Sequence, residues 1–496
     1  MKNEGLAAGD GVAVPEAREP DEAEAGFRPV PESAFPDRIL AEPIQGRLYL
    51  GLQWLRGRPL GRLVRRLQEW ERLEPADFDL LHERRLQEML SYARARAPLY
   101  RTGRWQTALS GSSGGLERWP VLERGVLRER SKELQALPKR PWHVVERTSG
   151  TTGTSIPIAL TSRDVTWRWA QRYRALLWHG IPIGVRTLRV SRVARPLRDR
   201  VLNQENVPTP LTPETLGGAA RFLRRERPGL VFGPPSALFV LSRYLGEVGA
   251  VGPLARFARV GGEQLFPFQR AEIERSLAQR VVDSYGCTEV GPVAGECPAG
   301  SLHVFAEHVH LEILRGEDPV EIGEFGDITV TSLNNTAMPL VRCRIGDRGR
   351  LSADRCSCGL PHPVLAELQA RTGDTFLAAD GSSRHTSEMV RRLGTFFADP
   401  VSAGARQILF CQVDPLTWRV WVEVAESSGL MDSAGRQRPM EERLASLVRD
   451  VSGSKCRVEA RFAETIPHEP GKYSYHRVVR PDEGTDSSPA EELPGQ

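Results

Sequence analysis

The sequence feature that most constrains the fold is an alternation of short apolar runs with amphipathic helical patterns between residues 187 and 284. Because each helix carries the chain back to begin the next strand, this alternation predicts an α/β fold with a substantially parallel sheet. Ligands of such sheets bind at the carboxyl ends of the strands. The predicted strands are Thr187–Val190, Gly229–Phe232, Phe257–Val260 and Val281–Ser284, and the predicted helices between them are Thr212–Arg227, Ser236–Val248 and Phe268–Ala278.

The segments on either side extend this organisation. Helical spacing of apolar residues predicts amphipathic helices from Asp77 to Ala97 and from Asp164 to His179. Beyond residue 303 the texture becomes β-rich, with strands expected at His310–Ile313, Asp327–Thr331 and Leu340–Arg344. A chain of 496 residues exceeds what one core holds. We expect a disordered tail (1–40), a large domain (41–372) that includes the β-rich subdomain, a small mobile α+β domain (373–480) and a second disordered tail (481–496).

Composition narrows the class of protein. The 40% hydrophobic and 26% charged content is ordinary for a soluble globular protein, and no run of 18 apolar residues predicts a membrane span. The N-terminus lacks the apolar core of a secretory signal, so we expect a cytoplasmic protein without a membrane partner. A net charge of +4 with arginines interspersed among acids argues against a nucleic-acid partner. Seven cysteines in a long chain do not indicate a disulfide framework.

One stretch is rich in glycine and hydroxyl residues between two β-like runs. Glycines allow close approach of the backbone, and backbone N–H and hydroxyl groups donate to phosphate oxygens, so the stretch is a candidate phosphate cradle. No lysine follows its last glycine, which argues against a Walker-type loop. A polar surface loop is the alternative interpretation. The residues are Thr148, Ser149, Gly150, Thr151, Thr152 and Gly153.

Eight motifs in order resemble those of the phenylacetate–coenzyme A ligase family, which belongs to the adenylate-forming superfamily. The resemblance covers about residues 80 to 480 and implies a large domain with a small mobile lid domain. The motifs are Leu86–Leu90 with Ala97–Tyr100, Thr148–Gly153, Gly261–Leu265, Ser284–Glu289, Arg342–Asp347, Cys356–Gly359, Ala370–Asp374 and Pro470–Lys472.

The resemblance implies ATP-dependent activation of a carboxylic acid, plausibly aromatic, as an acyl-adenylate with release of pyrophosphate. Coenzyme A would then accept the acyl group. Mg²⁺ would assist the nucleotide, and a homodimer is one expectation for the assembly. The implied roles are phosphate binding by Ser149–Thr154, adenine binding by Gly262, Glu263, Gln264, Tyr285 and Gly286, α-phosphate contact by Thr288, Mg²⁺ binding by Glu289, ribose binding by Asp347, ribose and phosphate contact by Arg371, a hinge at Asp374, and bridging of carboxylate and α-phosphate by Lys472.

Departures from the family pattern leave alternatives open. Thr154 and Ser155 stand where a lysine is frequent, and Ala370 stands where the hinge motif has glycine.

The acyl group could instead pass to an amine or a carrier protein, or a different oxyanion could be adenylated. A non-catalytic nucleotide-binding protein is a rival from another class. Trp178, His179 and Phe232 are candidates either for the acid pocket or for the core.

Two cysteines on a tight turn and a cysteine–histidine pair form a candidate zinc site. Four soft or borderline ligands suit tetrahedral structural zinc, and some members of the family carry a similar set. Free buried thiols are the alternative, since the spacing is looser than a Cys-x-x-Cys pair. The candidate ligands are Cys297, His303, Cys356 and Cys358, with Cys287 and His308 as nearby alternates.

Overall fold

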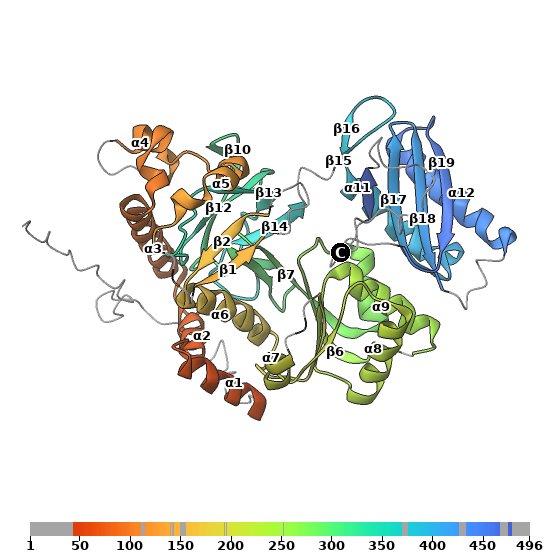
Figure 1. Cartoon of the computed structure of the whole chain (residues 1–496), viewed down its shortest axis with the longest axis horizontal. Helices are drawn as coiled ribbons and strands as arrows, with labels where there is room; N and C mark the ends of the chain where they lie inside the picture. Colours follow the sequence, from red (N-terminus) through yellow and green to blue (C-terminus); the bar gives the residue numbers. More distant parts are fainter. Residues whose placement is uncertain are drawn as a thin grey trace, which may run out of the picture.

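The computed structural model describes residues 43–110, 115–138, 140, 143–148, 155–192, 194, 196–250, 252–369, 375–425, 433–466 and 475–478. These residues form a large body built on a twelve-stranded sheet and a small body built on a four-stranded sheet, side by side in Figure 1. The boundary predicted near residue 372 falls within residues 370–374, outside the described residues. Among the described residues, no helix is long and apolar enough to cross a membrane.

The first half of the large sheet is parallel, as the strand–helix alternation predicts. Its strands run in the spatial order β4-β3-β5-β6-β7, and every neighbouring pair is parallel. Apolar residues of these strands and of their helices form one buried cluster that includes Leu188, Val231 and Val260. The elements are β3 (Thr187–Val190), β4 (Gln204–Val207), α8 (Pro213–Glu226), β5 (Leu230–Gly233), α9 (Pro235–Glu247), β6 (Ala255–Gly261), α10 (Pro267–Ser276) and β7 (Ala278–Cys287).

The direction of the strands reverses after β7, and the second half of the same sheet is antiparallel throughout. The segment from residue 284 to residue 291 is therefore a hairpin at the seam between the two halves. The spatial order continues as β8 (Gly291–Glu296), β9 (Leu302–Val304), β14 (Val364–Gln369), β13 (Cys343–Leu351), β12 (Gly326–Ser332), β10 (Val309–Arg315) and β11 (Asp318–Pro319).

The predicted strand Leu340–Arg344 is only partly correct, because β13 begins at Cys343. Arg342 has a φ of 47°, in the left-handed region, so the extended backbone cannot continue through it. Its guanidinium is buried and pairs with Glu312 at 3.0 Å while donating to the carbonyl of Trp119 at 2.8 Å. These contacts hold the residue in a conformation that the apolar pattern of the segment does not indicate.

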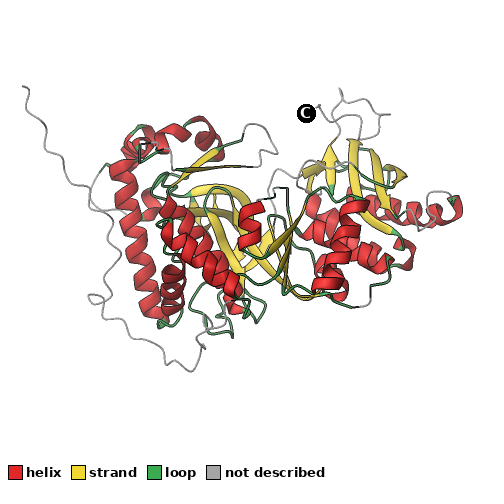
Figure 2. Ribbon diagram, turned by 60° about the horizontal axis from the view of Figure 1, so that its bottom comes forward, coloured by secondary structure: helices red, strands yellow, loops and turns green. Residues whose placement is uncertain are grey.

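Helices cover the large sheet (Figure 2). Two of them, α3 (Pro75–Arg96) and α6 (Ser162–Trp178), confirm the two amphipathic helices that the sequence predicts. Helix α6 begins with a capping box in which Thr161 and Asp164 exchange hydrogen bonds, and it packs against α2 and β8. The remaining elements are α1 (Ile44–Leu55), α2 (Leu60–Trp70), α3 (Pro75–Arg96), η4 (Pro98–Arg101), α4 (Gly103–Leu109), η5 (Leu116–Arg118), α5 (Arg124–Glu129), η6 (Ser131–Leu134), the hairpin β1 (Val144–Arg147) and β2 (Pro157–Leu160), α6 (Ser162–Trp178) and α7 (Pro196–Val201).

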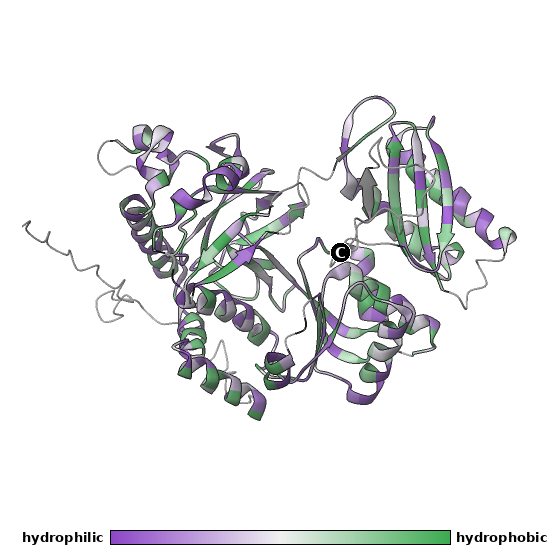
Figure 3. Ribbon diagram, in the orientation of Figure 1, coloured by the Kyte–Doolittle hydropathy of each residue, from purple (hydrophilic) through white to green (hydrophobic). Residues whose placement is uncertain are grey.

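The small body has the α+β composition that the sequence predicts. Its sheet has the order β19-β18-β17-β20, and its core surrounds the fully buried Trp418. Figure 3 shows hydrophobic residues along β17 and β18 and hydrophilic residues on α12. The elements are β15 (Thr375–Leu377), β16 (Ser383–His385), α11 (Thr386–Ala398), η7 (Pro400–Ser402), β17 (Ala405–Asp414), β18 (Thr417–Val424), α12 (Ala434–Ser452), β19 (Arg457–Ala463) and β20 (His476–Val478).

The small body rests on α9 and α10 of the large body. Arg406 makes a bidentate contact with Glu247, with nitrogen–oxygen distances of 2.9 and 2.7 Å. The ring of Phe397 packs against Phe239 and Phe268, with centroid separations of 4.8 and 5.7 Å. Aromatic packing and a charged pair thus fix how the two bodies meet.

Candidate active site

A pocket of about 660 Å³ lies between the two bodies, next to the seam of the large sheet. The large body lines it with residues at the carboxyl ends of β6 and β7, where ligands of parallel sheets bind. The small body contributes the start of α11 and the residue before β20. The lining includes Gly262–Phe266, Asp283–Gly286 and Asp347 from the large body, and His385–Ser387, Val390 and Tyr475 from the small body.

Tyr285 and Asp347 meet across this pocket although 62 residues separate them in the sequence. Tyr285 lies near the end of β7 and Asp347 lies in β13. The Tyr285 hydroxyl donates to Asp347 Oδ2 at 2.8 Å. The sequence predicts both as nucleotide-binding residues, and the structure brings them together in one pocket. The pair presents an aromatic face and a carboxylate that can accept from a diol.

The glycines of the predicted adenine-binding segment are explained by close backbone contacts. A Cβ atom at Gly261 would lie 2.7 Å from Ser284 Oγ, and one at Gly286 would lie 2.5 Å from the carbonyl oxygen of Gly291. Gly262 has a φ of 88°, which glycine adopts at no steric cost. These positions keep β6, β7 and the hairpin close together beneath the pocket.

Glu263 and Gln264 follow Gly262 at the rim of the pocket. Glu263 Oε2 accepts from the hydroxyl of Ser236 at 2.5 Å, which fixes the carboxylate against the start of α9. Gln264 Nε2 donates to the carbonyl of Leu368 at 3.3 Å, and so ties the segment to β14. Both residues line the pocket that holds Tyr285 and Asp347, and their role in adenine binding stays a prediction.

Thr288 and Glu289 lie on the turn of the seam hairpin, and a buried arginine holds that turn. Arg168 of α6 donates to the backbone carbonyls of Thr288 and Glu289 at 3.0 and 2.9 Å. It also pairs with Glu146 of β1 at 2.5 Å. The sequence analysis does not single out Arg168, because an arginine within an amphipathic helix is ordinarily exposed.

The side chain of Glu289 is fully buried, and Arg124 Nη2 lies 3.3 Å from its Oε1. Neither carboxylate oxygen accepts a hydrogen bond from the residues that the structure describes. A buried carboxylate with free oxygen lone pairs suits a hard, oxygen-seeking cation such as Mg²⁺. Arg124 is a second site residue that the sequence analysis misses, since 165 positions separate the ion-paired residues.

Several predicted site residues lie outside the described residues: Ser149, Gly150, Thr151, Thr152, Gly153, Arg371, Asp374 and Lys472. Thr148 is described and buried. Its Oγ1 accepts from the backbone N–H of Ile156 at 2.9 Å, and its carbonyl accepts from the Ser155 hydroxyl at 2.8 Å. Thr148 thus closes the base of the hydroxyl-rich stretch and connects β1 with β2.

Asp283 is a titratable pocket residue that the motif analysis passes over. Burial raises the pKa of its carboxyl to about 6, and the nearby Glu296 adds to the shift while Arg270 opposes it. Glu296 accepts from the Asp283 backbone N–H at 2.7 Å and pairs with Arg270 at 2.7 Å. Asp283 in the pocket lining is therefore flanked by a second acid, Glu296, and by one compensating guanidinium, that of Arg270.

The structure brings the four predicted zinc ligands together. One potential ligand atom from each of Cys297, His303, Cys356 and Cys358 lies within 4.8 Å of the others. The Sγ atoms of Cys297 and Cys356 are 3.7 Å apart, and Cys358 Sγ lies 3.2 Å from His303 Nε2. With zinc–sulfur bonds of about 2.3 Å, two thiolates of a tetrahedral site are separated by nearly 3.8 Å. Neither Cys287 nor His308 belongs to this cluster.

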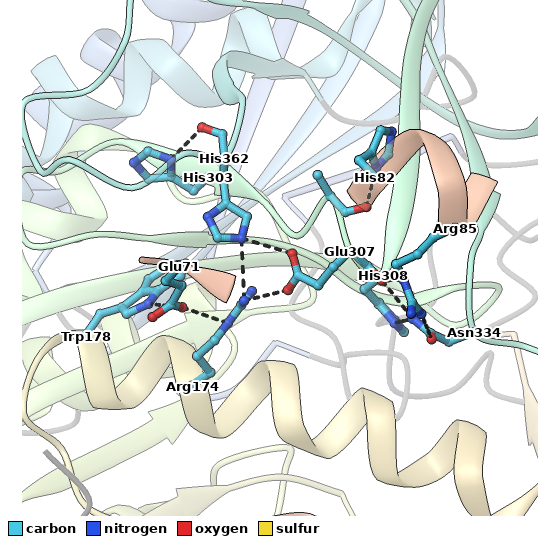
Figure 4. Close-up of polar contacts among 11 residues, drawn as sticks. Glu71, His82, Arg85, Arg174, Trp178, His303, Glu307, His308, Asn334 and His362 are labelled. Atoms are coloured by element: carbon cyan, nitrogen blue, oxygen red, sulfur yellow. Dashed lines mark hydrogen bonds and ion pairs between the residues drawn. The ribbon is translucent and has the colours of Figure 1, made fainter. Parts of the chain in front are cut away.

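The surroundings favour the thiolate form of Cys297 and Cys356, whose pKa values are lowered, but not that of Cys358, whose thiol pKa is raised by its contact with Cys297. Hydrogen bonds from Cys358 and His303 lower the pKa of the Cys297 thiol. His303 Nδ1 lies 3.1 Å from the carbonyl oxygen of His362. Figure 4 draws this contact as a dashed line. Because a carbonyl only accepts, Nδ1 carries the proton and Nε2 faces the thiols with its lone pair.

A buried polar network continues from His362 into the large body (Figure 4). His362 Nε2 lies 2.9 Å from Glu307, and Glu307 pairs with Arg174 at 2.5 Å. Arg174, which is fully buried, also pairs with Glu71 at 3.1 Å. The candidate acid-pocket residue Trp178 belongs here, since its indole N–H donates to Glu71 at 2.7 Å.

The other two candidates for the acid pocket also make contacts outside the 660 Å³ pocket. His179 Nε2 lies 2.7 Å from the carbonyl of Glu296. Arg259 lies over the ring of Phe232, 5.3 Å from its centroid. Neither residue lines the pocket that holds Tyr285 and Asp347.

Comparison with known proteins supports the resemblance. The chain is 24% identical over 425 residues to phenylacetate-coenzyme A ligase of Thermus thermophilus, covering 79% of this chain and 94% of that protein. It is 34% identical over 142 residues to phenylacetate-coenzyme A ligase of Escherichia coli, covering 27% and 32%. No family model matches the chain.

Solved structures share the fold. A crystal structure of 2-hydroxyisobutyryl-CoA ligase in the postadenylation state, in complex with 2-HIB-AMP, superposes with a TM-score of 0.67 at 20% identity, covering 82% of this chain and 90% of that one. The same enzyme in the thioesterification state gives 0.54.

The two-body fold is the one seen in 2-hydroxyisobutyryl-CoA ligase, a structure solved with an acyl-AMP in place. Over 79% of its length the chain is also similar to a phenylacetate-coenzyme A ligase, in agreement with the motifs of its sequence.

Proposed function

We propose that this protein activates a carboxylic acid with ATP, forming an acyl-adenylate and pyrophosphate, and then transfers the acyl group to coenzyme A. The observation that carries the proposal is the Tyr285–Asp347 pair in a pocket between two bodies, one of which carries Lys472 in its sequence. The similarity to phenylacetate-coenzyme A ligases favours an aromatic acid such as phenylacetate as the substrate.

Each described residue has a role that its position permits. Tyr285 offers its ring to adenine, and Asp347 accepts from the ribose hydroxyls. The Thr288 hydroxyl contacts the α-phosphate. Glu289 would hold Mg²⁺, which when bound supplies positive charge to the phosphates. The buried Arg168 keeps Thr288 and Glu289 in place by donating to their backbone carbonyls.

The residues outside the described part complete the proposal on the basis of the family resemblance. Residues Ser149–Thr154 would surround the β- and γ-phosphates with hydroxyl and backbone N–H donors. Arg371 would lie near ribose and phosphate, and Asp374 would act at the hinge. The ammonium of Lys472 would bridge the substrate carboxylate and the α-phosphate, offsetting the negative charge that develops at phosphorus during attack.

The sharpest test of this proposal is the substitution Lys472→Ala. Adenylate formation should fall at least about 100-fold, because an electrostatic contact made in the transition state is lost. ATP affinity should change little, since the pocket residues that bind the nucleoside remain. Pyrophosphate release and equilibrium ATP binding measure the two quantities. Lys455→Ala, at an exposed lysine of the same small body, is the matched control; equal turnover of both variants would refute the role.

Two further measurements identify the acid that is activated and the acceptor that receives the acyl group. A panel of aromatic and aliphatic acids is scored by ATP–pyrophosphate exchange without coenzyme A, which isolates the first half-reaction. Thiol consumption on addition of coenzyme A then reports the second. Exchange without thiol consumption would favour an amine, a carrier protein or another acceptor, and no exchange with any acid would oppose acid activation.

We also propose that Cys297, His303, Cys356 and Cys358 hold a structural zinc ion, because their separations and the His303 tautomer fit a closed tetrahedral site. Such an ion would connect the β8–β9 turn with the loop before β14. Cys356→Ser should lower the zinc content from about one per chain to well below half and should lower the melting temperature. Ser357→Ala, on the same turn, should retain the metal; full zinc content in the cysteine variant would contradict the site.

A further inference from the structure

Glu289 is an unusually placed acid. Its carboxylate is fully buried, and in the described part of the chain neither oxygen accepts a hydrogen bond. The thiols nearest to it are uncharged, since burial raises the pKa of both Cys287 and Cys343. A buried carboxylate in such surroundings requires a positive charge close by.

The cation that faces this carboxylate is Arg124, the first residue of α5. Its Nη2 lies 3.3 Å from Glu289 Oε1, and its Nη1 donates to the carbonyl of Ile345 in β13 at 3.1 Å. The Arg124 side chain is 26% exposed, so it is the member of the pair that reaches solvent. Arg168 does not compete for the carboxylate, since it binds backbone carbonyls and Glu146.

A divalent cation on Glu289 and a guanidinium 3.3 Å from the same oxygen would repel each other strongly at this depth. We propose that Arg124 is the resident counter-ion of Glu289 and leaves it when a divalent cation enters. Arg124 is then a positioning residue that acts through Glu289. The inference rests on the proposed assignment of Glu289 as the Mg²⁺ ligand.

A purely structural role for Arg124 makes a different prediction. If the side chain only ties α5 to β13, removing it lowers stability and leaves the affinity for a divalent cation unchanged. If it is a competing counter-ion, removing its charge tightens cation binding. The two roles therefore predict an unchanged and a tighter affinity for the cation, respectively, and this affinity can be measured without turnover.

The experiment titrates Mn²⁺ into the full-length protein without ATP or acid and follows free Mn²⁺ by electron paramagnetic resonance. Arg124→Met should bind Mn²⁺ about tenfold more tightly than the unaltered protein, since a competing charge is gone. Arg124→Lys, which keeps the charge, should remain near the unaltered affinity. Arg128→Met, at an exposed arginine of the same helix, is the matched control. Equal or weaker Mn²⁺ binding by Arg124→Met would overturn the proposal.

A second measurement uses the unaltered protein, so misfolding of a variant cannot affect its result. Release of Arg124 from Glu289 should increase its modification by phenylglyoxal severalfold when Mn²⁺ is present, while Arg128 stays unchanged. Peptide mass spectrometry quantifies both sites, and an Arg124 rate independent of Mn²⁺ would contradict the exchange.

The variant Glu289→Gln tests the proposed Mg²⁺ binding by Glu289 separately from the counter-ion role of Arg124. This variant should lose the Mn²⁺ site, and unchanged Mn²⁺ binding would overturn the inference together with the Mg²⁺ assignment. Loss of the site, combined with equal affinities in the Arg124 variants, would sink only the role of Arg124. Acid-dependent pyrophosphate exchange tests the reaction itself and is independent of both results.

Discussion

Asp283 illustrates how one pocket residue can carry pH dependence. Its folded-state pKa, about 6, lies above the ordinary value of 3.8, so the folded protein prefers the protonated acid. The stability that this preference supplies is complete below pH 4 and is lost as the pH rises through 6. At neutral pH the folded protein bears the cost of a desolvated charge near Glu296.

Asp283→Asn should therefore stabilise the protein at pH 7.5 by about 2 kcal/mol, because the amide needs no ionisation at a buried position. The difference should vanish near pH 4, where Asp283 is protonated in the folded protein. Urea unfolding at several pH values between 4 and 8 measures it. Asp354→Asn, at an exposed acid, should show no such trend; an Asp283 variant equally destabilised at every pH would contradict the argument.

At the residue scale, motif order predicts Tyr285, Asp347 and Glu289 as site residues, and the structure brings Tyr285 and Asp347 together in one pocket. Partners from distant segments are missed. Arg124 meets Glu289 only because α5 packs on β13, and Arg168 meets the hairpin only because α6 crosses it. Contacts between such distant segments leave no periodic pattern in the sequence. The Cys/His set can be predicted, because closely spaced cysteines by themselves indicate metal binding.

Helix α6 shows the same limit at the scale of an element. Apolar spacing predicts the helix correctly, but most of its residues are buried, including Arg174. The arginine is tolerated because Glu71 and Glu307 surround it, and those partners come from a loop after α2 and from the segment before β10. A helix buried on several faces cannot be oriented from its own pattern alone.

Arg174→Met should lower the free energy of unfolding by about 3–5 kcal/mol, because it leaves two buried carboxylates without their shared cation. Urea unfolding measures the change. The control is Arg84→Met, which breaks an exposed pair with Glu88 on α3 and should cost less than about 0.5 kcal/mol. Similar small effects in both variants would show that the network contributes little.

For the whole molecule, alternation of strands and helices predicts the parallel half of the sheet, and the β-rich texture predicts the antiparallel half. Their fusion into one twelve-stranded sheet is not predictable from either pattern, because it depends on the pairing of β7 with β8 at the seam. The contact between the bodies is likewise invisible in the sequence, since Glu247 and Arg406 are 159 positions apart.

Arg406→Gln should loosen that contact. The variant loses the bidentate pair with Glu247 but keeps the aromatic packing and the hydrogen bonds from Arg243 to the carbonyls of Ser402 and Ala405. Hydrogen exchange should accelerate severalfold at the end of α9 and at the start of β17, with little change in the core of either sheet. Arg438→Gln, at an exposed pair within α12, should leave exchange at these places unaltered; an identical pattern in the two variants would show that the Arg406–Glu247 pair adds little to the contact between the bodies.

The pocket takes one wall from each body, with Tyr285 and Asp347 on one side and Tyr475 and the start of α11 on the other. A ligand that contacts both walls stabilises the arrangement in which the two bodies are together. Its residence time then depends on how often the bodies separate, rather than only on the strength of its own contacts. Saturating nucleotide should accordingly shift the molecule toward the arrangement seen here, and product escape should follow the parting of the two halves.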